Sequence, residues 1–128
     1  MKRRRPLPAL VRVTAAGSGE LVCARCEVAD TVLRRTWGLL GRRGLDPDGG
    51  MLITRTGSVM TFFMRFPIDV VFLDRDERVV GIAHDLRPWR IAAARRAKSS
   101  LELPAGTAAG RGLRVGDVLV FEAAGAEV

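Results

Sequence analysis

Short apolar runs separated by polar or turn-forming residues constrain the fold of this chain more than any other feature. Four of these runs, rich in β-branched and aromatic residues, cover 51–53, 59–63, 70–73 and 79–83. Runs of three to five residues are typical of strands and are too short for most helices. Similar runs lie at 10–14, 21–23, 100–103 and 117–122. We therefore expect most of the chain to form a sheet.

One segment has the spacing of a helix instead. Apolar residues recur three or four positions apart from Val28 to Leu40, which is one face of an amphipathic helix. Asp30 near its start and Gly41 after its end fit the preferences of helix termini. We predict an α+β, β-rich fold, in which a small curled or barrel-like antiparallel or mixed sheet carries one main helix at about 28–40.

A chain of 128 residues has the length of one domain. We place a single β-rich domain at 9–123, a flexible basic tail at 1–8 and a C-terminal tail at 124–128. No apolar stretch is long enough to span a bilayer. Two prolines and Arg12 interrupt the apolar residues that follow the basic start, so we expect no export signal and a cytoplasmic protein.

Four motifs resemble, in the same order, those of a known prokaryotic family, the "domain of unknown function 192". They are WGLLGR at 37–42 followed by GML at 50–52, TFFMRFPIDVVFLD at 61–74, LELPAG at 101–106 and GLRVGD at 112–117. The resemblance implies a compact, β-rich single domain and supplies no reaction. Similar short members have a polar residue, often His, where this chain has Met60. That difference weakens an enzymatic hypothesis based on this position.

Polar residues of these motifs stand among Gly, Pro and apolar residues, where an isolated charge is costly and needs a partner. With two apolar neighbours they would line a mixed polar and apolar pocket whose arginines bind an anionic ligand. The predicted ligand-binding residues are Arg42, Met51, Phe63, Arg65, Asp69, Glu102 and Asp117. The alternative is structural: Asp69 and Asp117 cap turns, and Glu102 pairs with an arginine.

The Met and Phe residues of the central motif also have two interpretations. A surface of such side chains can bind an apolar ligand or a partner peptide. In a strand, Phe62, Phe63 and Met64 would instead pack in a core that covers both faces. We predict the core.

Cys23 and Cys26 form a Cys-x-x-Cys pair that is inert, metal-binding or redox-active. A structural zinc site needs four ligands, and the single histidine, His84, leaves the pair one ligand short. A redox dithiol needs a thiolate of low pKa, usually at a helix N-terminus, and Cys26 comes just before the predicted helix. We predict an inert pair, no cofactor and no metal, with these cysteines as the only candidate metal ligands.

Basic residues outnumber acidic ones by 21 to 14, which gives a net charge of +7. The excess lies in the N-terminal third and in 87–98, a segment that can bind phosphates. Aromatic residues make up only 5%, which argues against a stacking platform for bases. Three hypotheses remain. The first is a non-enzymatic binding or accessory module for a small ligand or protein partner. The second is an enzyme that uses Glu102 or Asp69 with an arginine, and the third is non-specific nucleic-acid binding through the basic tail and 87–98. We favour the first, because the chain has no complete catalytic set.

Overall fold

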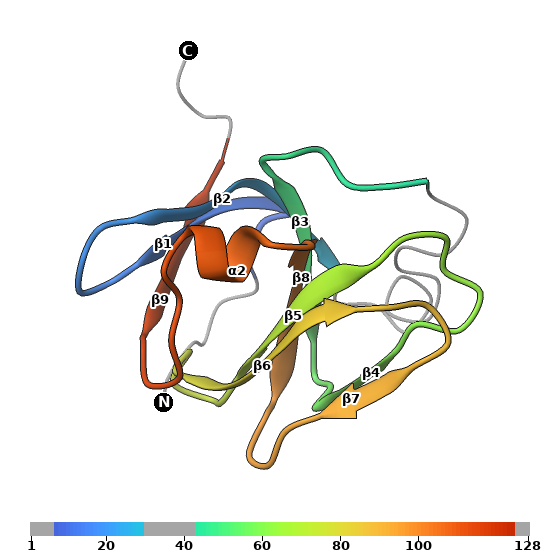
Figure 1. Cartoon of the computed structure of the whole chain (residues 1–128). Coiled ribbons are helices and arrows are strands. Elements are labelled where there is room, and N and C mark those ends of the chain that lie inside the picture. The colour runs from blue at the N-terminus through green and yellow to red at the C-terminus, as the bar shows by residue number, and fades with distance from the viewer. Residues whose placement is uncertain (1–6, 30–42, 125–128) are drawn as a thin grey trace.

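The computed structural model describes residues 7–29 and 43–124. Within these residues the chain forms nine strands and one short helix (Figure 1). The elements are β1 (Leu10–Ala15), β2 (Leu21–Ala29), β3 (Gly49–Thr54), β4 (Ser58–Met60), β5 (Ile68–Leu73), β6 (Val79–Leu86), β7 (Ile91–Ala93), β8 (Ser99–Pro104), α2 (Thr107–Gly110) and β9 (Leu119–Ala123). The predicted β-rich character is confirmed, and the described fold is mainly β rather than a balanced α+β.

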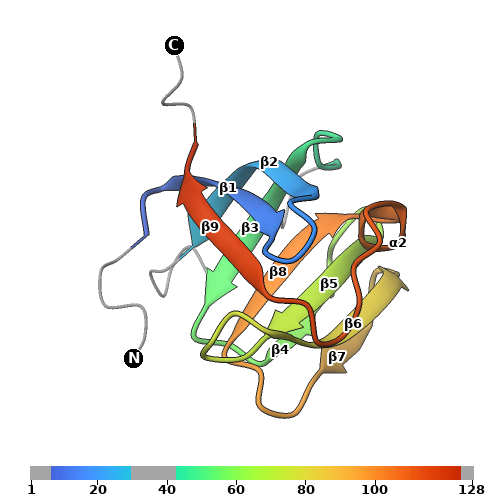
Figure 2. The ribbon, with the colours of Figure 1, turned by 90° about the vertical axis from the view of Figure 1, so that its left-hand side faces the viewer.

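Seven of the strands form one mixed sheet in the order β6-β5-β8-β3-β2-β1-β9. All neighbours in it are antiparallel except the parallel pair of β2 and β3. The sheet curls strongly (Figure 2), and its edge strands approach each other at a single bridge between Arg78 and Val118. One bridge does not close a barrel, so the sheet remains open.

The middle of the sheet is buried on both faces, as its apolar runs predict. All six residues of β5 and the first five of β8 are buried. The inner core, inside the curl, is made by side chains of the sheet together with Ala108 of α2 and Leu113. On the opposite face, the antiparallel pair of β4 and β7 covers a second cluster. We call this pair the ribbon, and the cluster beneath it the ribbon core, which includes Met51, Val59 and Val70.

The predicted helix at 28–40 is wrong at its start. Val28 and Ala29 are the last residues of β2, and they pair in parallel with Leu52 and Ile53 of β3. Both are buried, because this pairing places one side chain in each core. The remainder of the prediction, 30–40, lies outside the described residues.

Gly50 allows β3 to pass very close to its neighbours. A Cβ atom at this position would lie 2.8 Å from the carbonyl oxygen of Glu102 and 3.0 Å from Sγ of Cys23. Both distances are shorter than ordinary van der Waals contact. The glycine of the GML motif therefore has a packing role.

We expect Gly50→Ala to lower the free energy of unfolding by about 1–3 kcal/mol, since the added methyl overpacks a buried site. Urea denaturation of the purified chain measures the change. Gly44→Ala is the matched control, because a Cβ there meets nothing within 4 Å. Equal stabilities of the two variants would contradict the packing role.

Candidate functional site

Thr61 joins two loops at one end of the ribbon, the loop from β4 to β5 and the loop from β6 to β7. Its backbone N–H donates to the carbonyl of Arg90 at 2.8 Å, and its hydroxyl donates to the carbonyl of Arg87 at 2.6 Å. Its Oγ1 also accepts the N–H of Arg90 at 2.9 Å, and its carbonyl accepts the N–H of Trp89 at 3.1 Å. Because Thr61 is fully buried, these bonds form without competition from water and hold the two loops together.

The joined loops and the adjoining ribbon residues carry most of the large apolar side chains that are exposed in the described chain. The exposed members are Met60, Phe63, Trp89 and Ile91, and the half-buried Phe62 stacks on Trp89 beside them; we call these five residues the aromatic surface. Phe63 is 69% exposed and Trp89 is 54% exposed. The Trp89 ring lies 4.6 Å from the Phe63 ring and 5.4 Å from the Phe62 ring, measured between centroids, and stacks on the latter. Exposed apolar groups that lie together are typical of interaction surfaces, so this group is a candidate for one.

The expectation that Phe62 and Phe63 lie in a two-sided strand is wrong. β4 ends at Met60, because the hydrogen bonds of Thr61 go to the neighbouring loop. The chain then turns, with the N–H of Met64 donating to the carbonyl of Thr61 at 3.1 Å. Met64 is buried in the ribbon core while Phe63 is exposed, so the apolar block is divided between core and surface.

Exposed cations adjoin the aromatic surface in the sequence. Arg65 follows Phe63 by two positions, and Arg87 and Arg90 flank Trp89. Arg87 also forms an exposed ion pair with Asp85, at 3.9 Å. At the other end of β7, the turn into β8 carries three more exposed cations, which are Arg95, Arg96 and Lys98. We call the aromatic surface together with these cations the aromatic–arginine surface.

Arg87 and Arg90 belong to the segment 87–98 that the sequence offers for nucleic-acid binding. Of the other residues of the aromatic surface and its nearest cations, the predicted ligand-binding set contains only Phe63 and Arg65. It does not include Trp89, although a tryptophan between Pro88 and Arg90 in a basic loop was an available signal. The prediction for Arg42 lies outside the described residues.

Met51 and Glu102 lie directly opposite each other on β3 and β8 and are buried. Val70 of β5 pairs with Glu102 from the other side, so the carboxyl group stands in a row of apolar side chains. No hydrogen bond or ion pair to this carboxyl comes from the described part of the chain. Burial removes water from the charged form and raises the pKa of Glu102 to about 7.

The raised pKa predicts a specific pH dependence of stability. The unfolded chain releases the Glu102 proton near its ordinary pKa of 4.5, whereas the folded chain holds it up to about 7. Stability should therefore fall as the pH rises through this interval, by on the order of 3 kcal/mol. Urea denaturation as a function of pH should show this loss, and Glu102→Gln should abolish its part of it. The control is Glu122→Gln at an exposed position, which should lose stability with rising pH as the wild type does. Identical pH profiles for the wild type and Glu102→Gln would refute the raised pKa of Glu102.

Asp69 has the geometry of a structural residue. It is fully buried, and its carboxylate accepts the N–H of Asp85 on β6 and the N–H of Ala108 in α2, each at 2.8 Å. Gly106, the residue that caps α2, has no side chain to do so. Asp69 supplies that bond from β5 and ties three elements together.

Asp69→Asn should destabilise the fold by about 1.5–3 kcal/mol, because an amide nitrogen cannot accept one of the two buried N–H groups. Thermal and urea unfolding measure the loss. Asp46→Asn provides the comparison, since Asp46 is exposed and its variant should stay within about 0.5 kcal/mol of wild type. An Asp69→Asn variant as stable as this control would contradict the capping role.

Asp117 closes a tight turn: its carboxylate accepts the N–H of Arg114 at 3.0 Å, and its own N–H donates to the carbonyl of Arg114 at 3.1 Å.

Asp69 pairs with Leu103, which faces the inner core, whereas Glu102 pairs with Val70, which faces the ribbon core. The two buried carboxyl groups thus belong to opposite faces of the sheet and do not converge.

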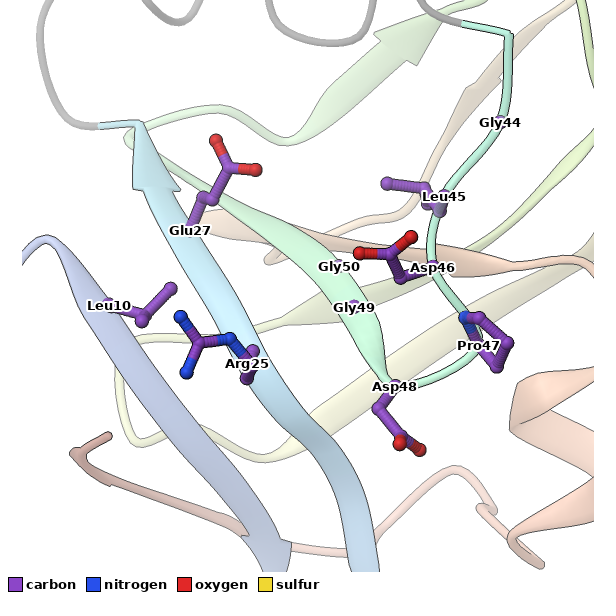
Figure 3. Close-up of a pocket in the computed structure, with 10 residues that line it drawn as sticks. All are labelled: Leu10, Arg25, Glu27, Gly44, Leu45, Asp46, Pro47, Asp48, Gly49 and Gly50. Carbon is purple, nitrogen blue, oxygen red and sulfur yellow. The ribbon is translucent and has the colours of Figure 1, made fainter. Parts of the chain in front are cut away.

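A hollow of about 610 Å³ is lined by none of the six predicted ligand-binding residues that the structure describes (Figure 3). Its described lining comes from β1, β2 and the start of β3, together with residues 44–48. Arg25 and Glu27 of β2 stand on one side, and Asp46 stands opposite (Figure 3). The wall carries charges of both signs, so the hollow is a second candidate for a small polar ligand.

Within residues 7–29 and 43–124, no group of three or more His, Cys, Asp or Glu side chains is placed to hold a metal ion. The one helix in these residues is too short to cross a membrane.

Fold and surface together define a small domain with one open, curled sheet, a covering ribbon and an aromatic–arginine surface. The family described as "DUF192: Uncharacterized ACR" matches residues 12–121, and the chain belongs to this family. Two relatives are UPF0127 proteins from archaea. The one from Pyrococcus abyssi is 34% identical over 100 residues, which are 73% of this chain and 82% of the relative. The one from Thermococcus sibiricus is 32% identical over 113 residues, which are 81% of this chain and 70% of the relative.

Two solved structures are also similar. A protein of unknown function from Novosphingobium aromaticivorans has a TM-score of 0.75 and 28% identity, and the match covers 87% of this chain and 83% of that one. A protein from Sinorhizobium meliloti has a TM-score of 0.77 and 29% identity over 92% and 98% of the two chains; it is described as a candidate transcription regulator. The family and its relatives are uncharacterised and indicate no specific function.

Proposed function

We propose that this protein is a non-enzymatic binding module that binds single-stranded nucleic acid through the aromatic–arginine surface. The observation that carries the proposal is a pair of exposed rings, Phe63 and Trp89, held 4.6 Å apart between exposed arginines. Bases stack on such rings whatever their sequence, and guanidinium groups bind the phosphates between them. One surface thus offers both kinds of contact that an unpaired strand needs.

The accessible residues support this version of the binding hypothesis. Of the residues predicted for a mixed pocket, Met51 and Glu102 are buried, while Phe63 and Arg65 are exposed. A ligand therefore meets the aromatic side chain and the arginine first, at the surface. The low overall aromatic content argued against a stacking platform, but two exposed rings in one place are sufficient for one.

Charge favours an extended anionic partner. The segment 87–98 holds five cations and no acidic residue, and β7 separates its cations into two groups at the ends of the ribbon. A strand lying along the ribbon would have phosphates near both groups. The description of the Sinorhizobium structural relative as a candidate transcription regulator is in line with such a partner.

The test is fluorescence anisotropy with a labelled oligothymidylate at low and moderate salt. Trp89→Ala and Phe63→Ala should each weaken binding by roughly 5–100-fold, the range of one lost base stack. Arg90→Ala should weaken it less and flatten the dependence on salt. Val115→Ala is the matched apolar control, because Val115 is exposed to a similar degree, 64%, outside this surface.

Vesicles of an anionic phospholipid provide the competing outcome, since exposed aromatic and basic side chains also adsorb to membranes. Binding to vesicles without binding to the oligonucleotide would overturn the proposal. So would oligonucleotide binding that Trp89→Ala and Val115→Ala leave equally unchanged, because it would place the strand elsewhere on this basic protein.

A further inference from the structure

A bulge in β2 brings the two cysteines to the same face of the sheet. Cys23 pairs with Val13 of β1 and Cys26 pairs with Val11, so β2 has one residue more than β1 between the two pairs. In a regular strand, residues three positions apart point to opposite faces. Here the extra residue turns both thiols into the inner core, where both cysteines are buried.

The two thiols interact directly and unequally. The side-chain hydrogen bond between the two thiols lowers the pKa of Cys23 and raises that of Cys26. The Cys26 Sγ also lies 3.6 Å from the carbonyl oxygen of Glu27. Burial raises the pKa of both thiols. At Cys23 the Asp48 carboxylate also raises the pKa, while the guanidinium of Arg111 lowers it. Cys23 is therefore the thiol that ionises first, and a thiolate is the reactive form of cysteine.

Cys23 also contacts an exposed turn. Its Sγ donates to the carbonyl of Asp48 at 3.5 Å, and Asp48 belongs to an exposed turn. Arg111 bridges Asp48 and Glu20 at 3.5 and 3.8 Å and is itself partly exposed. A salt-bridged cation at the protein surface thus lies near Cys23. Both cysteines are buried, with exposed fractions of 1% for Cys23 and 0% for Cys26.

We propose that Cys23 and Cys26 form a peroxide-reactive dithiol that closes to an intrachain disulfide. This inference does not depend on the proposed function. The Cys23 thiolate attacks one oxygen of hydrogen peroxide and breaks the O–O bond, giving a sulfenic acid and hydroxide, which takes up the proton released by Cys23. The Cys26 sulfur then attacks the sulfenic sulfur; the S–O bond breaks, and the oxygen leaves as a second water with the Cys26 proton. Overall, the dithiol loses two electrons and two protons, and peroxide is reduced to two waters.

The structure gives each step a residue. Cys23 is the attacking thiol, Cys26 the resolving thiol, and Arg111 stabilises the negative charge that develops next to Cys23. A small neutral oxidant suits the site, because a peroxide molecule needs far less opening at the Asp48 turn than a bulky disulfide does.

The test treats the reduced, full-length chain with hydrogen peroxide, alkylates the remaining thiols in denaturant, and follows the products by mass spectrometry. Wild type should lose two hydrogens and both alkylation sites while remaining monomeric. Cys26→Ala should stop at a Cys23 sulfenic acid that dimedone captures, whereas Cys23→Ala should react at least tenfold more slowly. Arg111→Gln should slow the reaction, and Arg114→Gln, at an exposed arginine outside the cluster, should not.

Circular dichroism of each variant keeps loss of fold distinct from loss of chemistry. The proposal fails if the folded wild type retains both thiols under conditions that oxidise the denatured chain. It also fails if the disulfide forms between chains, or if Cys26 is the first sulfur to be oxidised in a folded variant.

Discussion

A pair of mostly apolar central strands that is buried on both faces requires a cover on each face, and the rest of the structure follows from this requirement. β5 and β8 are buried along nearly their whole length. Curling of the sheet, with α2 at one end, encloses the inner face. The other face needs a separate element, and the ribbon of β4 and β7 supplies it through Val59 and Ala92. Because strand side chains alternate, the same ribbon must present Met60 and Ile91 outward.

Buried polar groups in this fold fall into two kinds. Thr61 and Asp69 are fully buried and hydrogen-bonded to backbone groups of distant segments, so they fix loops and helix ends in place. Glu102 stands between apolar side chains instead, and its burial costs free energy whenever it is charged. Thr61 and Asp69 therefore stabilise the fold, whereas Glu102 destabilises it as the pH approaches neutrality.

Most strands could be predicted from the sequence, because short β-branched runs bounded by turns report a local preference. β7 could not, since Ile91–Ala93 is short and two of its three residues are alanine. The start of the helix was misplaced, because the pairing of Val28 and Ala29 with β3 outweighs helical spacing. Two further features could not be predicted from the sequence. The exposure of Phe63 depends on hydrogen bonds between Thr61 and residues 26 and 29 positions away. The placement of both cysteines on one face of the sheet depends on a bulge in the pairing of β2 with β1.

Positions where the backbone departs from regular geometry separate structural turns from candidate sites. Six non-glycine residues of the described chain have positive φ, a conformation that costs about 1–2 kcal/mol for a residue with a Cβ. Glu77 lies in the tight turn between the antiparallel strands β5 and β6, and Arg96 lies in the turn that leads from β7 to β8, so a change of chain direction explains the cost at both. Phe63 and Trp89, at φ values of 68° and 67°, instead hold large rings exposed and in contact with each other. A fold that needed only to cover the ribbon core could bury these rings. Here a strained backbone, fixed by the buried Thr61, holds them outside instead. A surface prepared for a partner requires this arrangement.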